Sequence, residues 1–373
     1  MIETVIPKLV DKKFWLGKKV FLTGHTGFKG AWLALWLLHM GANVTGYALN
    51  PEGQDNLFAI LGLDKQLENS YFGDIRSQET LKKALKESKP DIVLHLAAQA
   101  LVLEGYRDPI ETLSTNIMGT STLLEALRSI ETVKTIVVVS SDKCYQNSET
   151  NLSFQESDPL GGVDPYSASK ACVEIVTNCY RQSFFQQNCI LASARAGNVI
   201  GGGDWSKDRL LPDLLRSIFN NEKIIIRHPQ AVRPWQHVLE PLSGYLILAQ
   251  RLFKNGSNYA QPWNFGPLDK DAKTVMEILQ FMQRHTNRPI NYSIKNNRID
   301  LKHEANFLKL NCEKSNRQLG WLPKWRIDQA IIKTLDWHAT WESEHQKNQL
   351  RPLYKSNAVI QKTLEQINEY HLA

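Results

Sequence analysis

The sequence predicts an α/β fold in which a doubly wound parallel sheet is joined to a smaller α+β lobe. Three observations support this prediction. Short apolar runs typical of buried strands alternate with helical patterns through the first half of the chain. A glycine-rich turn follows the first of these runs. Polar and charged motifs follow later runs, at the strand ends where ligands gather in such sheets.

The order of the elements favours parallel strands joined by helical crossovers. The predicted elements are strand 18–23, helix 30–40, strand 43–49, strand 91–96, helix 110–128, strand 135–140, a helix that carries Tyr166, and strand 190–195. The strands are short and apolar, and a parallel pair needs a long connection, which is usually a helix. We therefore predict a sheet of the Rossmann type.

Composition limits the classes of partner. The chain has 373 residues and 42% apolar content, enough for one large core or two modest ones. Its net charge of +6 is interleaved with acidic residues, whereas nucleic-acid binding usually needs a concentrated basic stripe. The longest apolar stretch, 31–40, is too short to cross a bilayer, and the first 16 residues lack a signal-peptide core. No nucleic-acid or membrane partner is expected.

Cysteine and histidine spacing points to a reduced, metal-free protein. The five cysteines are odd in number and show no CxxC spacing, which is typical of free thiols in the cytoplasm. The histidines, including His303 beside Glu304, lack the spacing of metal ligands. We expect a cytoplasmic protein without a bound metal.

The glycine loop Gly24-His25-Thr26-Gly27-Phe28-Lys29-Gly30 joins the first strand to the first helix. Such a turn lets the backbone approach a pyrophosphate at the positive amino end of the helix. The GxxGxxG spacing is looser than the GxGxxG fingerprint, so an ordinary strand-to-helix turn is the alternative. The sequence patterning around the loop favours a dinucleotide site.

The residue after the second strand bears on the choice of dinucleotide. Asn50 stands where an acidic residue would bind the adenosine ribose. An asparagine can bond a ribose hydroxyl but does not repel a 2′-phosphate, and we predict NAD rather than NADP. Asp74 is expected to reach the adenine, with a solvated turn aspartate as the alternative.

The pair Tyr166 and Lys170 is four residues apart and lies on one face of a helix that starts at Asp164-Pro165. A phenol has a pKa of about 10, and a nearby ammonium together with a positive nicotinamide ring would lower it. Tyr166 could then take a proton from a substrate hydroxyl as a hydride leaves the same carbon. The alternative is a solvent-facing pair on an amphipathic helix, which a lone YxxxK pattern does not exclude.

Ser141-Asp142-Lys143 follows a fully apolar strand, where side chains point into the cleft. Ser141 is predicted to bond the reacting hydroxyl, and Asp142 to act as a general acid if burial raises its pKa. Lys143 is predicted to act as a base or as a cation that stabilises an enolate. A capping turn is the alternative.

These motifs together resemble the extended short-chain dehydrogenase/reductase superfamily, and within it the CDP-glucose group of nucleotide-sugar 4,6-dehydratases. The resemblance covers roughly residues 18–325. Beyond the motifs above it rests on 97–99, 106–109, 115–120, 195–205 and 233–244, of which the last two are long and unusual. One departure is Leu103, where the family usually has an arginine.

The resemblance implies an NAD-dependent lyase that converts CDP-glucose to CDP-4-keto-6-deoxyglucose and water, for deoxysugar and surface-polysaccharide synthesis. Tyr166 would deprotonate the 4-hydroxyl while NAD takes the C4 hydride, with Ser141 and Lys170 assisting. A base would then remove the C5 proton, Asp142 would protonate the departing 6-hydroxyl, and the hydride would return to C6. Other 4,6-dehydratases have Glu where Lys143 stands, which leaves the C5 base open. A homodimer or homotetramer is expected.

The expected binding residues fall into two sets. Those for NAD are Gly24, Thr26, Gly27, Phe28, Lys29, Gly30, Asp74, Ile75, Ala97, Ala98, Gln99, Asn116, Tyr166 and Lys170. Those for the nucleotide-diphosphate hexose are Asn198, Arg209, Arg233 and Asn264. A guanidinium fork suits a diphosphate, which is the reason for assigning it to Arg233.

The sequence changes character after Arg195. Residues 201–205 predict a loop, 212–220 a helix and 223–227 a short strand, and the chain is more polar from residue 274. We predict an NAD-binding domain over 1–197, with 238–260 returning to it, and a substrate-binding lobe over 198–237 and 261–373.

Two other functions fit parts of the pattern. A nucleotide-sugar epimerase or decarboxylase would use the same Tyr166 and Lys170 but needs no acid for a 6-hydroxyl, so Asp142-Lys143 favours the dehydratase. A non-catalytic NAD-binding module would not need to keep both the tyrosine and the lysine.

Overall fold

A seven-stranded parallel sheet forms the centre of the protein, as predicted. The computed structural model describes residues 9–51, 53, 56–147, 152–220, 222–286, 288–294, 307–348 and 355–373. In chain order the strands are β1 (Lys19–Thr23), β2 (Asn43–Ala48), β3 (Asn69–Phe72), β4 (Ile92–His95), β5 (Thr135–Val139), β6 (Ile190–Ala196) and β11 (Pro262–Phe265). Their spatial order is β11-β6-β5-β4-β1-β2-β3, with every pair parallel.

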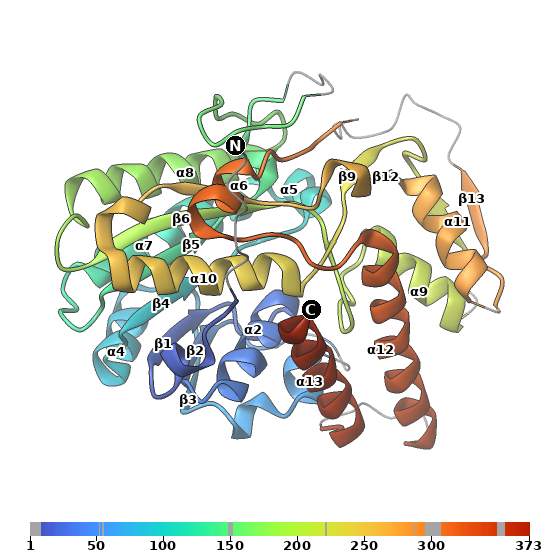
Figure 1. Ribbon diagram of the computed structural model, residues 1–373, viewed down its shortest axis with the longest axis horizontal. Coiled ribbons are helices and arrows are strands. Elements are labelled where there is room, and N and C mark those ends of the chain that lie inside the picture. Colours follow the sequence, from blue (N-terminus) through green and yellow to red (C-terminus); the bar gives the residue numbers. More distant parts are fainter. Residues whose placement is uncertain are drawn as a thin grey trace, which may run out of the picture.

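Helices cover both faces of this sheet (Figure 1). One face carries α2 (Phe28–His39) and α10 (Leu239–Asn255), and the other carries α4 (Gln78–Ser88), α7 (Gly119–Leu127) and α8 (Pro165–Ser183). Alternate residues of a strand point to opposite faces. Accordingly, Val20 and Leu22 lie in the core under α2, whereas Phe21 lies in the core under α4 and α7. Burial on both sides explains why the central strands β4 and β5 are almost continuous apolar runs.

A smaller lobe adjoins the carboxyl ends of the strands. It contains α9 (Leu210–Asn220), α11 (Val275–His285) and α12 (Ile327–Lys347), which share a core with β8 (Ile224–Ile226). Its short strand pairs are β8 with β13 (Tyr292–Ile294), β9 (Val232–Pro234) with β12 (Ala272–Thr274), and β7 (Val199–Ile200) with β10 (Gln236–His237). The predicted helix over 212–220 and strand over 223–227 are confirmed.

Two segments expected in the smaller lobe lie with the first domain instead. β11 is the edge strand beside β6, because Trp263 and Phe265 bury their side chains in the core under α10. The last helix, α13 (Asn357–Leu372), packs against α2 and beside α12 (Figure 1). Neither segment has a pattern that distinguishes one apolar core from the other.

Two further details differ from the predictions. β3 is absent from the predicted strands, because two of its four residues are exposed, two are half-buried, and the segment lacks the apolar run of a central strand. The helix expected over 110–128 is divided into α6 (Pro109–Leu113), a π-helical turn η2 (Ser114–Met118) and α7. Such π-turns are frequent at functional sites.

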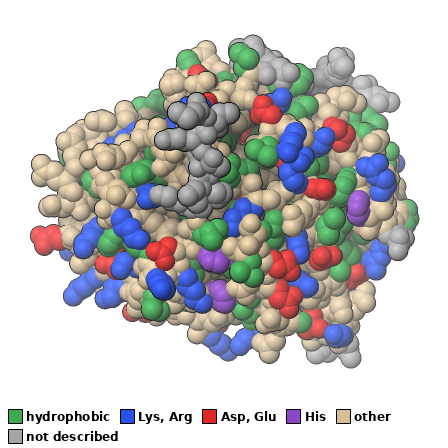
Figure 2. Space-filling model, viewed as in Figure 1, with side chains coloured by type: hydrophobic (Ala, Val, Ile, Leu, Met, Phe, Trp, Pro, Cys, Tyr) green, Lys and Arg blue, Asp and Glu red, His purple; other side chains and the backbone are tan. Residues whose placement is uncertain are grey.

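The surface agrees with the mixed charge pattern of the sequence. On the face drawn in Figure 2, Lys and Arg side chains are interleaved with Asp and Glu and form no single-sign stripe. Within the described ranges, no helix has the length and apolar character needed to cross a membrane. His303 and Glu304, considered above as metal ligands, lie outside the described residues.

Candidate active site

The glycine loop forms a tight turn between β1 and α2. Gly24 has a φ of 76°, and a Cβ there would lie 2.8 Å from the backbone nitrogen of Ala97. A Cβ at Gly30 would lie 2.0 Å from the carbonyl oxygen of Gly24. Only glycine therefore permits this contact of the loop with its own helix and with the chain after β4. The turn offers bare backbone at a helix amino end, which fits the pyrophosphate of a dinucleotide.

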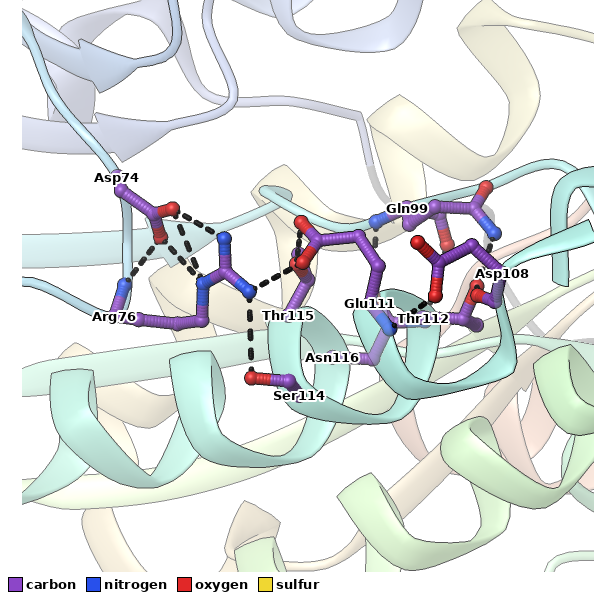
Figure 3. Close-up of polar contacts among 9 residues, drawn as sticks. All are labelled: Asp74, Arg76, Gln99, Asp108, Glu111, Thr112, Ser114, Thr115 and Asn116. Carbon is purple, nitrogen blue, oxygen red and sulfur yellow. Dashed lines mark hydrogen bonds and ion pairs between the residues drawn. The ribbon is translucent and has the colours of Figure 1, made fainter.

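Asp74 is held by an arginine rather than left free beside the turn (Figure 3). The Arg76 guanidinium lies 2.5 Å from Asp74 Oδ2 and 2.6 Å from Glu111 Oε2, and it donates to Ser114 Oγ at 3.3 Å. This hydrogen bonding lowers the pKa of Asp74. The adjacent Ile75 packs against Gly119, where a Cβ would lie 2.5 Å from its Cγ2. If the Asp74 carboxylate bound the adenine, it would have to do so while still paired with Arg76.

Asn116 in the π-turn ties the chain after β4 to α8 (Figure 3 shows its region). Its amide donates to the Gln99 carbonyl at 3.0 Å and to Ser169 Oγ at 2.8 Å, and accepts from the Gln99 backbone at 2.8 Å. The Gln99 side chain in turn donates to Thr112 Oγ1 at 2.7 Å. These bonds fix the backbone of 97–99, which faces the glycine loop.

The predicted reaction residues lie together at the carboxyl end of β5. Ser141 Oγ donates to Asp142 Oδ1 at 2.9 Å, and Ser141 is close enough to the phenol of Tyr166, on α8, to lower its pKa. The Asp164 carboxylate caps α8 by accepting from the Ser167 backbone at 3.0 Å. This cap places Tyr166 in the first turn, and Lys170 Nζ lies 5.9 Å from the centre of its ring.

The pKa of the Tyr166 phenol in the protein chain alone is set mainly by burial. Burial raises the pKa of Tyr166 to about 12, although the bond from Ser141 lowers it, and the charge of Asp142 raises it further. Burial also lowers the pKa of Lys170 to about 8. The predicted downward shift requires the positive nicotinamide ring as well as the ammonium, and it stays a prediction. In the protein chain alone, desolvation outweighs the lowering effects of Ser141 and Arg209. The phenol is neutral at pH 7 until a further positive charge enters the site.

Asp142 has the environment predicted for a general acid. The carboxyl is 2% exposed, and its Oδ2 has no hydrogen-bond partner among the residues that the structure describes. Burial raises its pKa, while the charges of Lys143 and Arg233 oppose that shift. A buried carboxyl with one open oxygen is suited to hold a proton and deliver it to a ligand.

Four polar residues behind this site were not predicted. Glu174 on α8 accepts from Arg195 at 2.8 Å and from Ser193 at 2.7 Å, and also from Ser140. Burial would raise the pKa of Glu174, but these donors, Arg195 foremost, lower it. The ion pair joins α8 to β6, and the hydrogen bond from Ser140 adds the chain directly after β5. No local motif marks it, because its members come from three separate segments.

Breaking this pair should destabilise the protein strongly. We expect Glu174→Gln to lower the free energy of unfolding by about 3 kcal/mol, because it leaves the buried Arg195 guanidinium without its counter-charge. Glu125→Gln, which breaks the exposed pair with Arg128, should cost under about 1 kcal/mol. Urea denaturation of both variants measures the difference, and equal midpoints would contradict the assignment.

The predicted substrate residues divide into two groups. Arg233 is buried and acts electrostatically on Asp142, and Arg209 acts on Tyr166 while pairing with Asp204 at 3.1 Å. Asn198 lies between β6 and β7, where its carbonyl accepts from the Gln236 backbone at 3.1 Å.

Asn264 belongs to a different environment. Its amide donates to the carbonyls of Phe154 and Asn311, and its Oδ1 accepts from Tyr145 at 2.7 Å. Both amide hydrogens are therefore used within the protein, and the residue is fully buried. This geometry opposes the predicted substrate contact and makes Asn264 a support for the strands behind the site.

The known proteins that are similar to this chain are nucleotide-sugar dehydratases and epimerases. A family model described as GDP-mannose 4,6 dehydratase matches residues 21–334. The chain is 50% identical over 339 residues to the CDP-glucose 4,6-dehydratase of Salmonella typhimurium, covering 89% of this chain and 94% of that protein. It is 25% identical over 340 residues to a UDP-glucose 4-epimerase of Halalkalibacterium halodurans, covering 87% and 96%.

The solved structures show the same fold. The dTDP-glucose 4,6-dehydratase of Bacillus anthracis, solved in complex with NAD, superposes with a TM-score of 0.71 at 22% identity. The match covers 88% of this chain and 98% of that chain.

Proposed function

Because this chain belongs to the family described as GDP-mannose 4,6 dehydratase, we propose that it is an NAD-dependent lyase, a CDP-glucose 4,6-dehydratase. The choice of CDP-glucose as the substrate rests on the 50% identity, over 89% of the chain, to a relative named CDP-glucose 4,6-dehydratase. The product would be CDP-4-keto-6-deoxyglucose, a precursor for deoxysugars of surface polysaccharides.

The cofactor fits the residues present. The glycine turn, the fixed backbone of 97–99 and Asn116 would hold NAD along the carboxyl ends of β1 and β4. NAD, when bound, accepts a hydride from C4 of the sugar and later supplies one to C6. Its positive ring would also provide the charge that the phenol of Tyr166 lacks in the chain alone.

The chain's own residues then move the protons. Tyr166 takes the proton of the 4-hydroxyl, with Ser141 orienting it and Lys170 stabilising the phenolate. The 4-ketone acidifies C5, where we place Lys143 as the base or as the cation that stabilises the enolate. Asp142 gives its proton to the departing 6-hydroxyl. An epimerase would need no acid here, so the buried Asp142 supports the dehydratase.

The substrate would be gripped from the smaller lobe. Arg233 and Arg209 are proposed for the diphosphate and nucleotide, with Asn198 beside them. We retain the division of the chain into an NAD-binding domain over 1–197 with 238–260 and a substrate lobe, to which β11 and α13 are exceptions. A cytoplasmic homodimer or homotetramer is proposed. Exposed apolar side chains at Ile110, Met118 and Ile175 on the helices of one face support pairing.

Turnover of four nucleotide sugars tests the proposal. CDP-, dTDP-, GDP- and UDP-glucose are each incubated with the protein, and the alkaline absorbance of a 4-keto-6-deoxy product is followed. We expect product from CDP-glucose at least tenfold faster than from the others. Faster conversion of another sugar would overturn the choice of nucleotide, and a C4 epimer as product would overturn the reaction.

A further inference from the structure

A second ammonium and phenol pair faces the reaction centre from the other layer of helices. Lys29 lies at the start of α2, and its Nζ donates to the hydroxyl of Tyr245 on α10 at 2.9 Å. The same Nζ lies 5.1 Å from the centre of the Tyr245 ring. Tyr166 and Lys170 belong to α8, which covers the opposite face of the sheet. The two pairs thus approach the site from both sides.

The Lys29 ammonium has no counter-charge. Within the described part of the chain, no carboxylate lies within ion-pair distance of its Nζ. Tyr245 is fully buried, and burial, with the charges of Tyr166 and Asp142, raises its pKa, so it offers Lys29 a neutral oxygen. The charged side chains Lys170 and Arg209, which act on Lys29, are both cations.

The surroundings of Lys29 lower its pKa. Burial lowers its pKa to about 7, Lys170 and Arg209 lower it further, and only Asp142 opposes them. An ammonium held near other cations, with no anion beside it, disfavours any cationic ligand group nearby and tolerates the same group once it is neutral. On the proposed function, the nicotinamide ring is such a group, being cationic when oxidised and neutral when reduced.

We propose that Lys29, held in place by Tyr245, is a charge-tuning residue that biases the site toward the reduced coenzyme. The bias favours the first chemical step. In that step C4 loses a hydride with its bonding electrons, the coenzyme is reduced, and the hydroxyl proton goes to Tyr166. This inference rests on the proposed function, and it assigns to Lys29 more than a contact with the coenzyme's phosphates.

The test compares affinities for the two forms of the coenzyme. Coenzyme-free full-length protein is titrated with NAD and with NADH, and the ratio of the two dissociation constants is measured. We expect Lys29→Met to move this ratio about tenfold toward the oxidised form, which corresponds to about 30 mV in the potential of the bound coenzyme. Lys29→Arg, which keeps the charge, should stay near the wild-type ratio. Lys254→Met replaces an exposed lysine of α10, the helix that carries Tyr245, and is the matched control.

The outcomes separate the possible roles. Equal weakening of both forms would assign Lys29 to the phosphates and overturn the inference, as would an unchanged ratio. The wild-type protein provides a test that needs no variant. As pH rises through 7 its ratio should move in the same direction as in Lys29→Met, and the variant should move less. The groups that act on Lys29 in this test are Lys170 of α8, Arg209 and Asp142, together with its partner Tyr245, on which Tyr166 acts in turn. Failure of the wild-type protein to bind either form would overturn the proposed function itself.

Discussion

Replacing Tyr166 with phenylalanine should lower kcat for the dehydration of CDP-glucose by roughly 10³-fold, within the range of 10²–10⁴ typical for loss of a general base. Among the described residues, the phenol is the candidate base that lies beside both Ser141 and Lys170. Its ring is buried and would remain in the variant, so KM should change less than threefold. Steady-state kinetics with a coupled product assay measures both constants.

A tyrosine further along the same helix supplies the control. Tyr180 donates to Glu125 at 3.3 Å on the surface of α8, away from the site, so Tyr180→Phe should retain near wild-type kcat. Native-like unfolding of Tyr166→Phe would exclude a folding defect. If Tyr166→Phe kept more than a tenth of the wild-type kcat, another group would have to take the 4-hydroxyl proton.

The parts of the site that the sequence predicts are those encoded in contiguous residues. The glycine loop needs glycine where it meets α2 and the chain after β4, and the pair Tyr166 and Lys170 needs one helical turn. Ser141 and Asp142 need only the end of an apolar strand. Each requirement appears directly as a residue type at a fixed spacing. For this reason the sequence alone is enough to predict these residues.

The parts that sequence does not predict depend on contacts between distant segments. Arg195 and Glu174 form their pair across a strand and a helix, and Asn264 is used by Tyr145, 119 residues earlier. Such partners have no spacing rule. The assignment of β11 failed for the same reason, because an apolar segment fits either core equally well.

The pKa of Tyr166 shows another property that a sequence motif does not determine. A motif indicates which charges are near a phenol but not how much water is removed from it. Here burial dominates and raises the pKa to about 12. Burial also raises the pKa of Asp142, which meets the condition on which its predicted acid role depends. For that carboxyl, desolvation and the proposed catalysis both favour the protonated form. Desolvation therefore assists the acid and opposes the base.

This contrast makes Asp142→Asn the more discriminating experiment. Asparagine keeps the oxygen that accepts from Ser141 at 2.9 Å, so the geometry at Tyr166 should persist. Oxidation at C4 should therefore continue, seen as the absorbance of reduced coenzyme in a single turnover. Release of water from C6 should fall by about 10²–10⁴-fold, because no proton reaches the departing hydroxyl.

The pH profile of the same variant gives an independent check. In the wild-type protein the acid works only while protonated, so elimination should decline as pH rises through the raised pKa of Asp142. Asp142→Asn should lose that decline, since an amide does not titrate. Equal loss of C4 oxidation and of elimination would instead make Asp142 a partner of Tyr166 in the first step. Water loss at the wild-type rate would require the proton to come from another group. Lys143, which directly follows Asp142 in the sequence, would be the next residue to replace.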